Sequence, residues 1–89
     1  MQQSSSTKSV TVYTTSVCPY CKAAKQLLEQ EGIAYEEKDV TGQDDKRAWL
    51  LEKTGRRTVP QIFFGEESVG GYDDLAALKQ AGQLHQRLR

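Results

Sequence analysis

The chain has 89 residues, the size of one small domain with a single hydrophobic core. Its 12 Lys and Arg side chains balance its 12 Asp and Glu side chains, so its charge does not favour a nucleic-acid or membrane partner. No apolar run is long enough to cross a membrane or to form the core of a signal peptide. We therefore expect a cytoplasmic, monomeric protein, with residues 1–9 as a flexible polar leader and residues 10–89 as one domain.

The first expected elements are a strand, a helix and a second strand. Residues 10–14 are β-branched and aromatic, as in a strand. Residues 19–31 fit a helix that begins with proline and ends before Gly32. Residues 33–39 alternate apolar and charged side chains, which indicates a shorter strand. The buried face of the helix is expected to carry Cys21, Ala24, Leu27, Leu28 and Glu31.

The second half of the chain predicts a helix followed by a hairpin. Residues 43–53 are acidic at the start and basic near the end, and Gly55 follows them, as in a helix. Residues 61–64 and 68–69 form two short β-prone runs around a Gly-Glu-Glu turn.

A third helix is expected after a Gly-Gly break. Either Asp73 or Asp74 is expected to be its N-cap, and the helix runs through Lys79. Leu84 and Leu88 are four residues apart, which indicates a last helical turn packed on the body of the domain.

These elements form a βαβ unit followed by a ββα unit. The first crossover should be right-handed and make the first two strands parallel, and the hairpin then adds antiparallel strands. A Cys-x-x-Cys pair beside a βαβ unit is typical of a thioredoxin-like redox fold. The sequence therefore predicts an α/β thioredoxin-like fold, a mixed four-stranded sheet flanked by helices on both faces.

The two cysteines, Cys18 and Cys21, lie at the start of the first helix. Unpaired backbone N–H groups and the positive end of the helix dipole favour the thiolate form of Cys18 there. Cys21, about one turn later, should be buried and able to attack a mixed disulfide that Cys18 forms. We therefore predict thiol–disulfide exchange, with Cys18 as the nucleophile and Cys21 as the resolving thiol.

Structural and metal roles for the cysteines are weaker hypotheses. A disulfide across so short a loop removes little entropy from the unfolded chain. A zinc site needs a second ligand pair, and His85 is distant in sequence and expected on the surface, so no metal is predicted. Lys22 and Lys25 either add positive charge near Cys18 or form a solvated helix face.

Three motifs together resemble the glutaredoxin family in its dithiol form, over nearly the whole domain. They are Cys18-Pro19-Tyr20-Cys21, Thr58-Val59-Pro60 and Gly70-Gly71-Tyr72-Asp73-Asp74-Leu75. The resemblance implies a glutathione-dependent disulfide oxidoreductase, with glutathione as co-substrate and no tightly bound cofactor. Its partners would be glutathionylated or disulfide-bonded proteins.

The resemblance also implies one side of a glutathione site. Arg57 would pair with the glycyl carboxylate of glutathione. Thr58, Val59 and Pro60 would lie beside the reactive sulfur, with a cis Val59–Pro60 bond that presents the Val59 backbone to a bound peptide. Tyr20 sits in the first turn of the helix on its open side, so we expect an exposed ring that flanks the sulfur.

The other side of the implied site is the Gly-rich turn. Backbone N–H groups at Gly71 and Tyr72 would bind the γ-glutamyl carboxylate, as the start of a helix binds anions. Asp73 or Asp74 would bind the ammonium group, and the sequence leaves open which of them does.

Two positions depart from the family pattern. Many members carry a lysine shortly before the first cysteine, where this chain has Thr14-Thr15-Ser16, so Arg57 or Arg56 would have to hold the glycyl carboxylate. Tyr72 stands where the family often has a cysteine, which removes a third thiol. The large aromatic side chains elsewhere are expected to be packing residues: Trp49, Phe63 and Phe64.

Two other functions stay open as alternatives. One is a thioredoxin-like reductant without a glutathione site, against which the Gly-rich turn argues. The other is a carrier of a glutathione-ligated iron–sulfur cluster. Pro19 argues against a carrier, because relatives built for clusters usually have Gly at that position.

Overall fold

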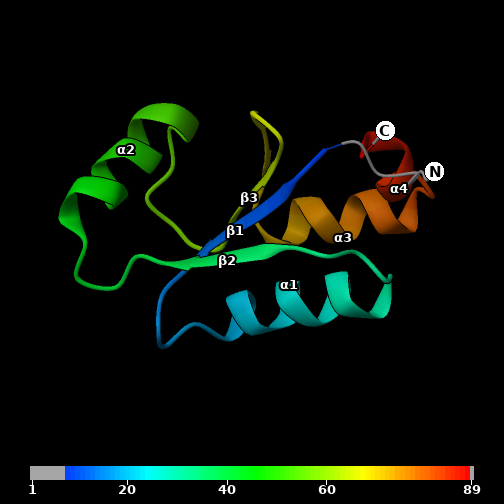
Figure 1. The fold of residues 1–89 in the computed structure, drawn as a ribbon, viewed down its shortest axis with the longest axis horizontal. Coiled ribbons are helices and arrows are strands. Elements are labelled where there is room, and N and C mark those ends of the chain that lie inside the picture. The colour runs from blue at the N-terminus through cyan, green and yellow to red at the C-terminus, as the bar shows by residue number, and fades with distance from the viewer. Residues whose placement is uncertain (1–7, 89) are drawn as a thin grey trace.

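The structure, a computed structural model, describes residues 8–88. Most of the predicted leader, residues 1–7, lies outside the described residues. In chain order the elements are β1 (Val10–Thr14), α1 (Pro19–Gln30), β2 (Glu36–Asp39), α2 (Asp44–Thr54), β3 (Gln61–Phe64), β4 (Glu67–Gly70), α3 (Tyr72–Gln80) and α4 (Leu84–Arg87) (Figure 1).

The four strands form one mixed sheet in the order β2-β1-β3-β4. β1 is parallel to β2, while β1 with β3 and β3 with β4 are antiparallel. A βαβ unit thus precedes a ββα unit, and the predicted thioredoxin-like sheet is confirmed.

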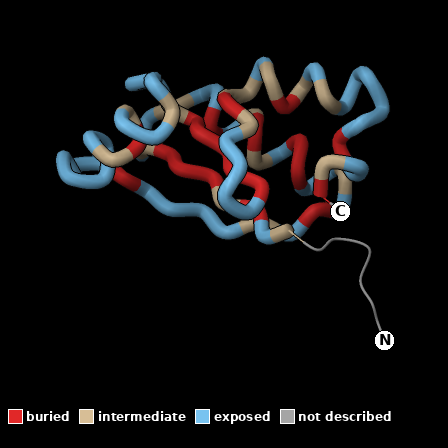
Figure 2. Tube along the Cα trace, turned by 90° about the horizontal axis from the view of Figure 1, so that it is seen from above, coloured by how far each residue is buried: buried red, intermediate tan, exposed pale blue. Residues whose placement is uncertain are grey.

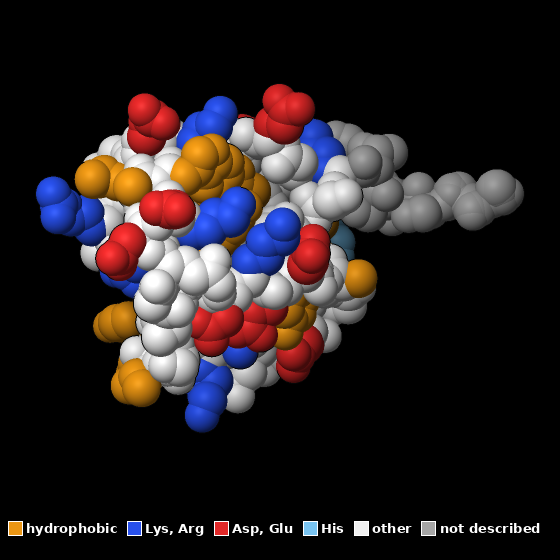
Figure 3. Space-filling view, turned by 60° about the vertical axis from the view of Figure 1, so that its left-hand side comes forward, with side chains coloured by type: hydrophobic (Ala, Val, Ile, Leu, Met, Phe, Trp, Pro, Cys, Tyr) orange, Lys and Arg blue, Asp and Glu red, His pale blue; other side chains and the backbone are white. Residues whose placement is uncertain are grey.

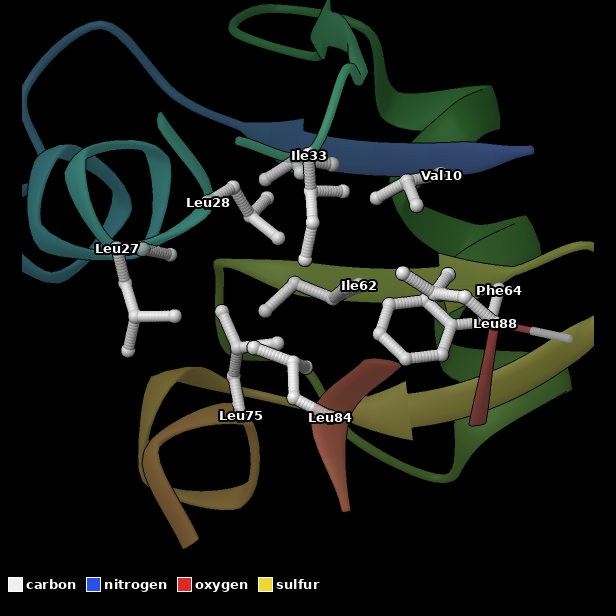
Figure 4. Packing of buried hydrophobic residues seen from close by; sticks show 11 residues of the cluster. Val10, Leu27, Leu28, Ile33, Ile62, Phe64, Leu75, Leu84 and Leu88 are labelled. Carbon is white, nitrogen blue, oxygen red and sulfur yellow. The ribbon is translucent and has the colours of Figure 1, made fainter. Parts of the chain in front are cut away.

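Helices cover both faces of the sheet (Figure 1). The side chains of β1 and β3 alternate between the two faces, and both strands are buried along most of their length (Figure 2). On one face Val12 and Ile62 pack with α1, α3 and α4 in the main core (Figure 4). On the other face Tyr13 and Phe63 pack against Leu50 of α2. The labelled core side chains are Val10, Leu27, Leu28, Ile33, Ile62, Phe64, Leu75, Leu84 and Leu88.

The smaller core under α2 is aromatic. The ring centroids of Tyr13 and Phe63 are 5.6 Å apart, and those of Trp49 and Phe63 are 6.0 Å apart. Trp49 is partly buried, and Phe63 and Phe64 are buried. The prediction that these three aromatic residues serve packing is confirmed.

α1 begins and ends where its sequence predicts, to within one residue. Cys18 is the N-cap, Pro19 is the first helical residue, and Glu31 is the C-cap before Gly32, whose φ is 71°. The buried face carries four of the five expected residues, and Glu31 is half-buried.

The second strand is shorter than predicted. The prediction covered residues 33–39, whereas β2 covers Glu36–Asp39 and all four of its residues are exposed at the edge of the sheet. The Ile33 N–H donates to the Leu28 carbonyl at 2.9 Å, so Ile33 is tied to the end of α1 and packs in the core from there.

The start of α3 also differs from the prediction. Gly71 is the N-cap, and neither Asp73 nor Asp74 takes that position. Asp74 lies inside the first turn, where its carboxylate accepts a hydrogen bond from the Gly71 N–H at 2.9 Å. One aspartate therefore does cap the helix, but from within it. No helix formed by residues 8–88 is long and apolar enough to cross a membrane.

Candidate active site

Cys18 and Cys21 form a disulfide at the start of α1. Their Cα atoms are 5.2 Å apart, within the ordinary range for a disulfide. The Cys21 N–H donates to Cys18 Sγ at 3.1 Å, which is the capping contact of the helix. Cys21 is 2% exposed, while Cys18 is only partly buried. The outer sulfur thus meets the helix N-terminus and solvent, as a nucleophile requires, and the inner sulfur is shielded.

The Thr58-Val59-Pro60 segment lies against the reactive sulfur. The Val59 carbonyl oxygen is 3.6 Å from Cys18 Sγ, and the Val59–Pro60 peptide bond is cis, as expected. Thr58 is exposed and Pro60 is buried, so the segment passes from the surface into β3 beside the disulfide.

A groove of about 230 Å³ lies beside this segment. It is bounded by the Thr58-Val59-Pro60 segment on one side and by the start of α3 on the other. Its lining residues are Tyr20, Arg56, Thr58, Val59, Pro60, Gly71, Tyr72, Asp73 and Asp74. The structure therefore brings together every predicted binding residue except Arg57.

Arg56 lines the groove in place of Arg57. The contact that the structure gives for Arg57 is through its main chain, whose carbonyl lies 3.4 Å from Arg47 Nη2. From the sequence, Arg57 was the first candidate for the glycyl carboxylate and Arg56 the alternative. Of the two arginines, the structure thus places Arg56 in the groove lining and in contact with Asp74, and Arg57 outside that lining.

The Asp74 carboxylate carries the polar contacts at the start of α3. Its Oδ2 accepts the Gly71 N–H at 2.9 Å and lies 3.0 Å from Arg56 Nη1. The Gly71 hydrogen bond and then the Arg56 contact hold the pKa of the Asp74 carboxyl below its usual range. Gly70, with a φ of 121°, lies so close to Asp74 that a Cβ there would clash with the carboxylate. The Gly-Gly pair therefore makes room for the aspartate.

Two large side chains next to Cys18 in sequence or one residue further on are exposed. Val17 is 88% exposed and Tyr20 is 63% exposed. The Tyr20 ring lies 6.1 Å from the Tyr72 ring, so the two tyrosines form one edge of the groove. Figure 3 shows the molecule from the side on which α1 begins, where acidic and basic side chains are interspersed with small hydrophobic patches.

The lysines on α1 differ from one another. Lys25 Nζ is 3.0 Å from Glu37 Oε2 on β2, so its charge is neutralised by an ion pair, whereas Lys22 is exposed. His85 lies on the surface, 3.4 Å from Glu31 Oε1. Among residues 8–88, no cluster of three or more His, Cys, Asp or Glu side chains could hold a metal ion.

A larger hollow of about 590 Å³ lies near the start of β1. The cysteines come after the end of β1, so this hollow is at the opposite end of the strand from them. None of the predicted site residues lines it. The predicted binding residues other than Arg57 line the smaller groove beside the disulfide, so that groove is the candidate binding site.

Comparisons with known proteins agree with this geometry. The family model for glutaredoxin matches residues 10–69. A glutaredoxin from Pseudomonas aeruginosa is 52% identical over 75 residues, which are 84% of this chain and 89% of the relative. The solution structure of glutaredoxin from Brucella melitensis has a TM-score of 0.85 and 42% identity, covering 98% of this chain and 94% of that one. The crystal structure of a buckwheat glutaredoxin–glutathione complex has a TM-score of 0.85 and 31% identity, covering 94% of this chain and 79% of that one.

A thioredoxin-like sheet with a Cys-Pro-Tyr-Cys pair at the start of its first helix defines a thiol–disulfide oxidoreductase. The match to the family model and the 52% identity then fix the family. The chain belongs to the glutaredoxin family, with the dithiol form of its active site.

Proposed function

We propose that the protein uses glutathione to reduce protein–glutathione mixed disulfides and protein disulfides. The observation that carries this proposal is the groove beside Cys18, which presents peptide backbone, one cation and two carboxylates. Glutathione is a peptide with one ammonium group and two carboxylates. A groove carboxylate can take the ammonium, the arginine can take one carboxylate, and backbone N–H groups at the start of α3 can take the other. The similar buckwheat protein, whose crystal structure is a glutathione complex, supports the same ligand.

The groove residues suit the different parts of that ligand. The backbone of Val59 would pair with the cysteinyl residue of glutathione, since an extended peptide can add to a free backbone edge. The start of α3, at Gly71 and Tyr72, would bind the γ-glutamyl carboxylate, and Asp73 or Asp74 its ammonium. Arg56 or Arg57 would bind the glycyl carboxylate, and Arg56 is the one that lines the groove.

The first reaction needs Cys18 alone. Its thiolate attacks the glutathione sulfur of a mixed disulfide, the sulfur–sulfur bond to the protein breaks, and the protein thiolate leaves. A glutathione thiolate then attacks the glutathione bound to Cys18. This step releases oxidised glutathione and regenerates the Cys18 thiolate. The net reaction consumes one glutathione, which leaves as oxidised glutathione together with the glutathione that was bound to the substrate.

The second reaction needs both cysteines. Cys18 attacks a protein disulfide and forms a mixed disulfide with one of its sulfurs, and Cys21 then attacks Cys18 Sγ. The second substrate thiolate leaves, and the Cys18–Cys21 disulfide remains, which is the form of the site in the structure. Glutathione reduces this disulfide to complete the cycle.

The electron donor tests the proposal. Turnover of a small glutathionylated substrate is measured with glutathione, glutathione reductase and NADPH, and in parallel with thioredoxin reductase and NADPH. We expect turnover only with glutathione. Turnover only with thioredoxin reductase would favour a reductant without a glutathione site, and a cluster carrier would show visible absorbance after purification. A cytoplasmic location and a monomeric state remain predictions.

A further inference from the structure

Gln61 is a fully buried polar residue at the start of β3, with an exposed fraction of 0%. Its Nε2 donates to the Thr58 carbonyl oxygen at 2.8 Å and lies 3.5 Å from Thr58 Oγ1. Its Oε1 has no hydrogen-bond partner among the described residues. A buried polar atom without a partner destabilises a fold, so an apolar side chain of similar length would suit this position better as core. The link from the amide to Thr58 explains this residue better than packing does.

The side chain closes a ring around two residues of the active site. Its backbone belongs to β3, where Gln61 is paired with Tyr13 of β1, and its amide reaches back to Thr58. The ring encloses Val59 and Pro60, and the Val59 carbonyl lies 3.6 Å from Cys18 Sγ. An exposed segment is thus tied by a hydrogen bond to the centre of the sheet, which is the rigid part of the fold.

We propose that Gln61 is a positioning residue for thiol exchange, whose amide fixes the Thr58-Val59 backbone as the edge that pairs with the peptide backbone of glutathione. The inference rests on the proposed use of glutathione. Gln61 is buried behind this segment, so it would act through Val59 and not on the substrate itself.

A comparison of two disulfide reagents separates positioning from chemical reactivity. Oxidised glutathione offers a peptide backbone to Val59, whereas 2-hydroxyethyl disulfide offers none. In a Cys21→Ser background, the Cys18 thiolate attacks either reagent, its sulfur–sulfur bond breaks, and one thiolate leaves as the mixed disulfide with Cys18 forms. Intact-mass spectrometry at equilibrium gives the fraction of each adduct, and the ratio of the two equilibrium constants is the preference for glutathione.

Gln61→Met, added to Cys21→Ser, should lower this preference by about three- to tenfold, the range for one net hydrogen bond. The equilibrium with 2-hydroxyethyl disulfide should stay unchanged, because it does not use the Val59 edge. The melting temperature should not fall appreciably, since Thr58 lies in an exposed segment and the unpartnered Oε1 is removed. Gln61→Leu serves as a second variant if the methionine does not fit.

Val10→Ala is the matched control for a general loss of stability. Val10 is a buried residue at the other end of β1, and its truncation should lower the melting temperature without changing the preference for glutathione. Unchanged preference in both Gln61 variants would overturn the inference and leave the proposed function standing. An equal loss in Val10→Ala would also overturn it. If the Cys21→Ser parent shows no preference for glutathione, the proposed function fails, and the role of Gln61 fails with it.

Discussion

Arg56 Nη1 lies 3.0 Å from Asp74 Oδ2, and this ion pair joins the loop after α2 to the first turn of α3. Both side chains are about half exposed and both line the groove beside the disulfide. A ligand with an ammonium group and a carboxylate could therefore replace the Arg56–Asp74 ion pair with two new ones. Its ammonium would pair with Asp74 and its carboxylate with Arg56. The groove contains the two opposite charges that a zwitterionic peptide needs.

Arg56→Ala should raise the glutathione concentration needed for half-maximal turnover several-fold. A charge-assisted hydrogen bond contributes about 1.5–3 kcal/mol when desolvated, and an open groove should give the lower end or less. The measurement is the KM for glutathione in the coupled assay at low and high salt. Arg57→Ala is the matched control and should have the smaller effect. A larger effect of Arg57→Ala would mean that the side chain before the Thr-Val-Pro motif turns into the groove when ligand binds.

The ion pair and the helix cap should also make stability depend on pH. The pKa of Asp74 is lowered in the folded protein, so its stabilisation is fully present above the unfolded value of about 3.9. It is lost as the pH falls through the lower folded value. The contribution should be below about 1 kcal/mol, because the side chain is partly exposed and screened by solvent.

Urea denaturation of wild type and Asp74→Ala at neutral pH and below pH ~3 tests this expectation. The difference in unfolding free energy between the two proteins should shrink at acid pH. A difference of the same size at both values would show that the ionised carboxylate contributes nothing to α3.

Cys18 should be alkylated far faster than Cys21 in the reduced protein at neutral pH. The helix N-terminus stabilises the charge of the outer sulfur, and burial shields the inner one. Iodoacetamide labelling with peptide mass mapping over time measures the two rates. Equal labelling of both thiols would contradict the assignment of nucleophile and resolving thiol.

Cys21→Ser should keep turnover of a small glutathionylated substrate and lose reduction of protein disulfides that need a resolving thiol. Cys18→Ser should lose both activities, because the remaining thiol, Cys21, is buried and cannot begin the exchange. Loss of activity on the small substrate in Cys21→Ser would exclude the reaction that uses one thiol.

The sequence predicted those elements whose signals are local. α1 has Pro19 at its first position, a buried stripe and Gly32 just past its end, and these place it to within one residue. The predicted range of the second strand is too long at its start, because the β-branched residue Ile33 is typical of a strand. Its contact with the end of α1 depends on tertiary packing, which no local pattern reveals.

The choice between Arg56 and Arg57 likewise depends on the path of the chain. Gly55 ends α2 with a φ of 74°, and Thr54 Oγ1 accepts the Arg56 N–H at 3.1 Å. The path of the chain through these contacts brings Arg56 to Asp74. Because two adjacent arginines have the same side chain, the sequence alone does not indicate which of them faces the aspartate. Gln61 was predicted only as a strand residue, since its link to Thr58 is visible only in three dimensions.

Intact-mass spectrometry of Cys21→Ser mixed with an equimolar S-glutathionylated peptide tests the central claim most directly. The claim is that Cys18 attacks the glutathione sulfur, held there by the groove beside it. The account predicts that the protein gains the mass of glutathione on Cys18 and that the free peptide thiol appears in equal amount. A protein that carries the peptide instead, with glutathione released, would contradict it.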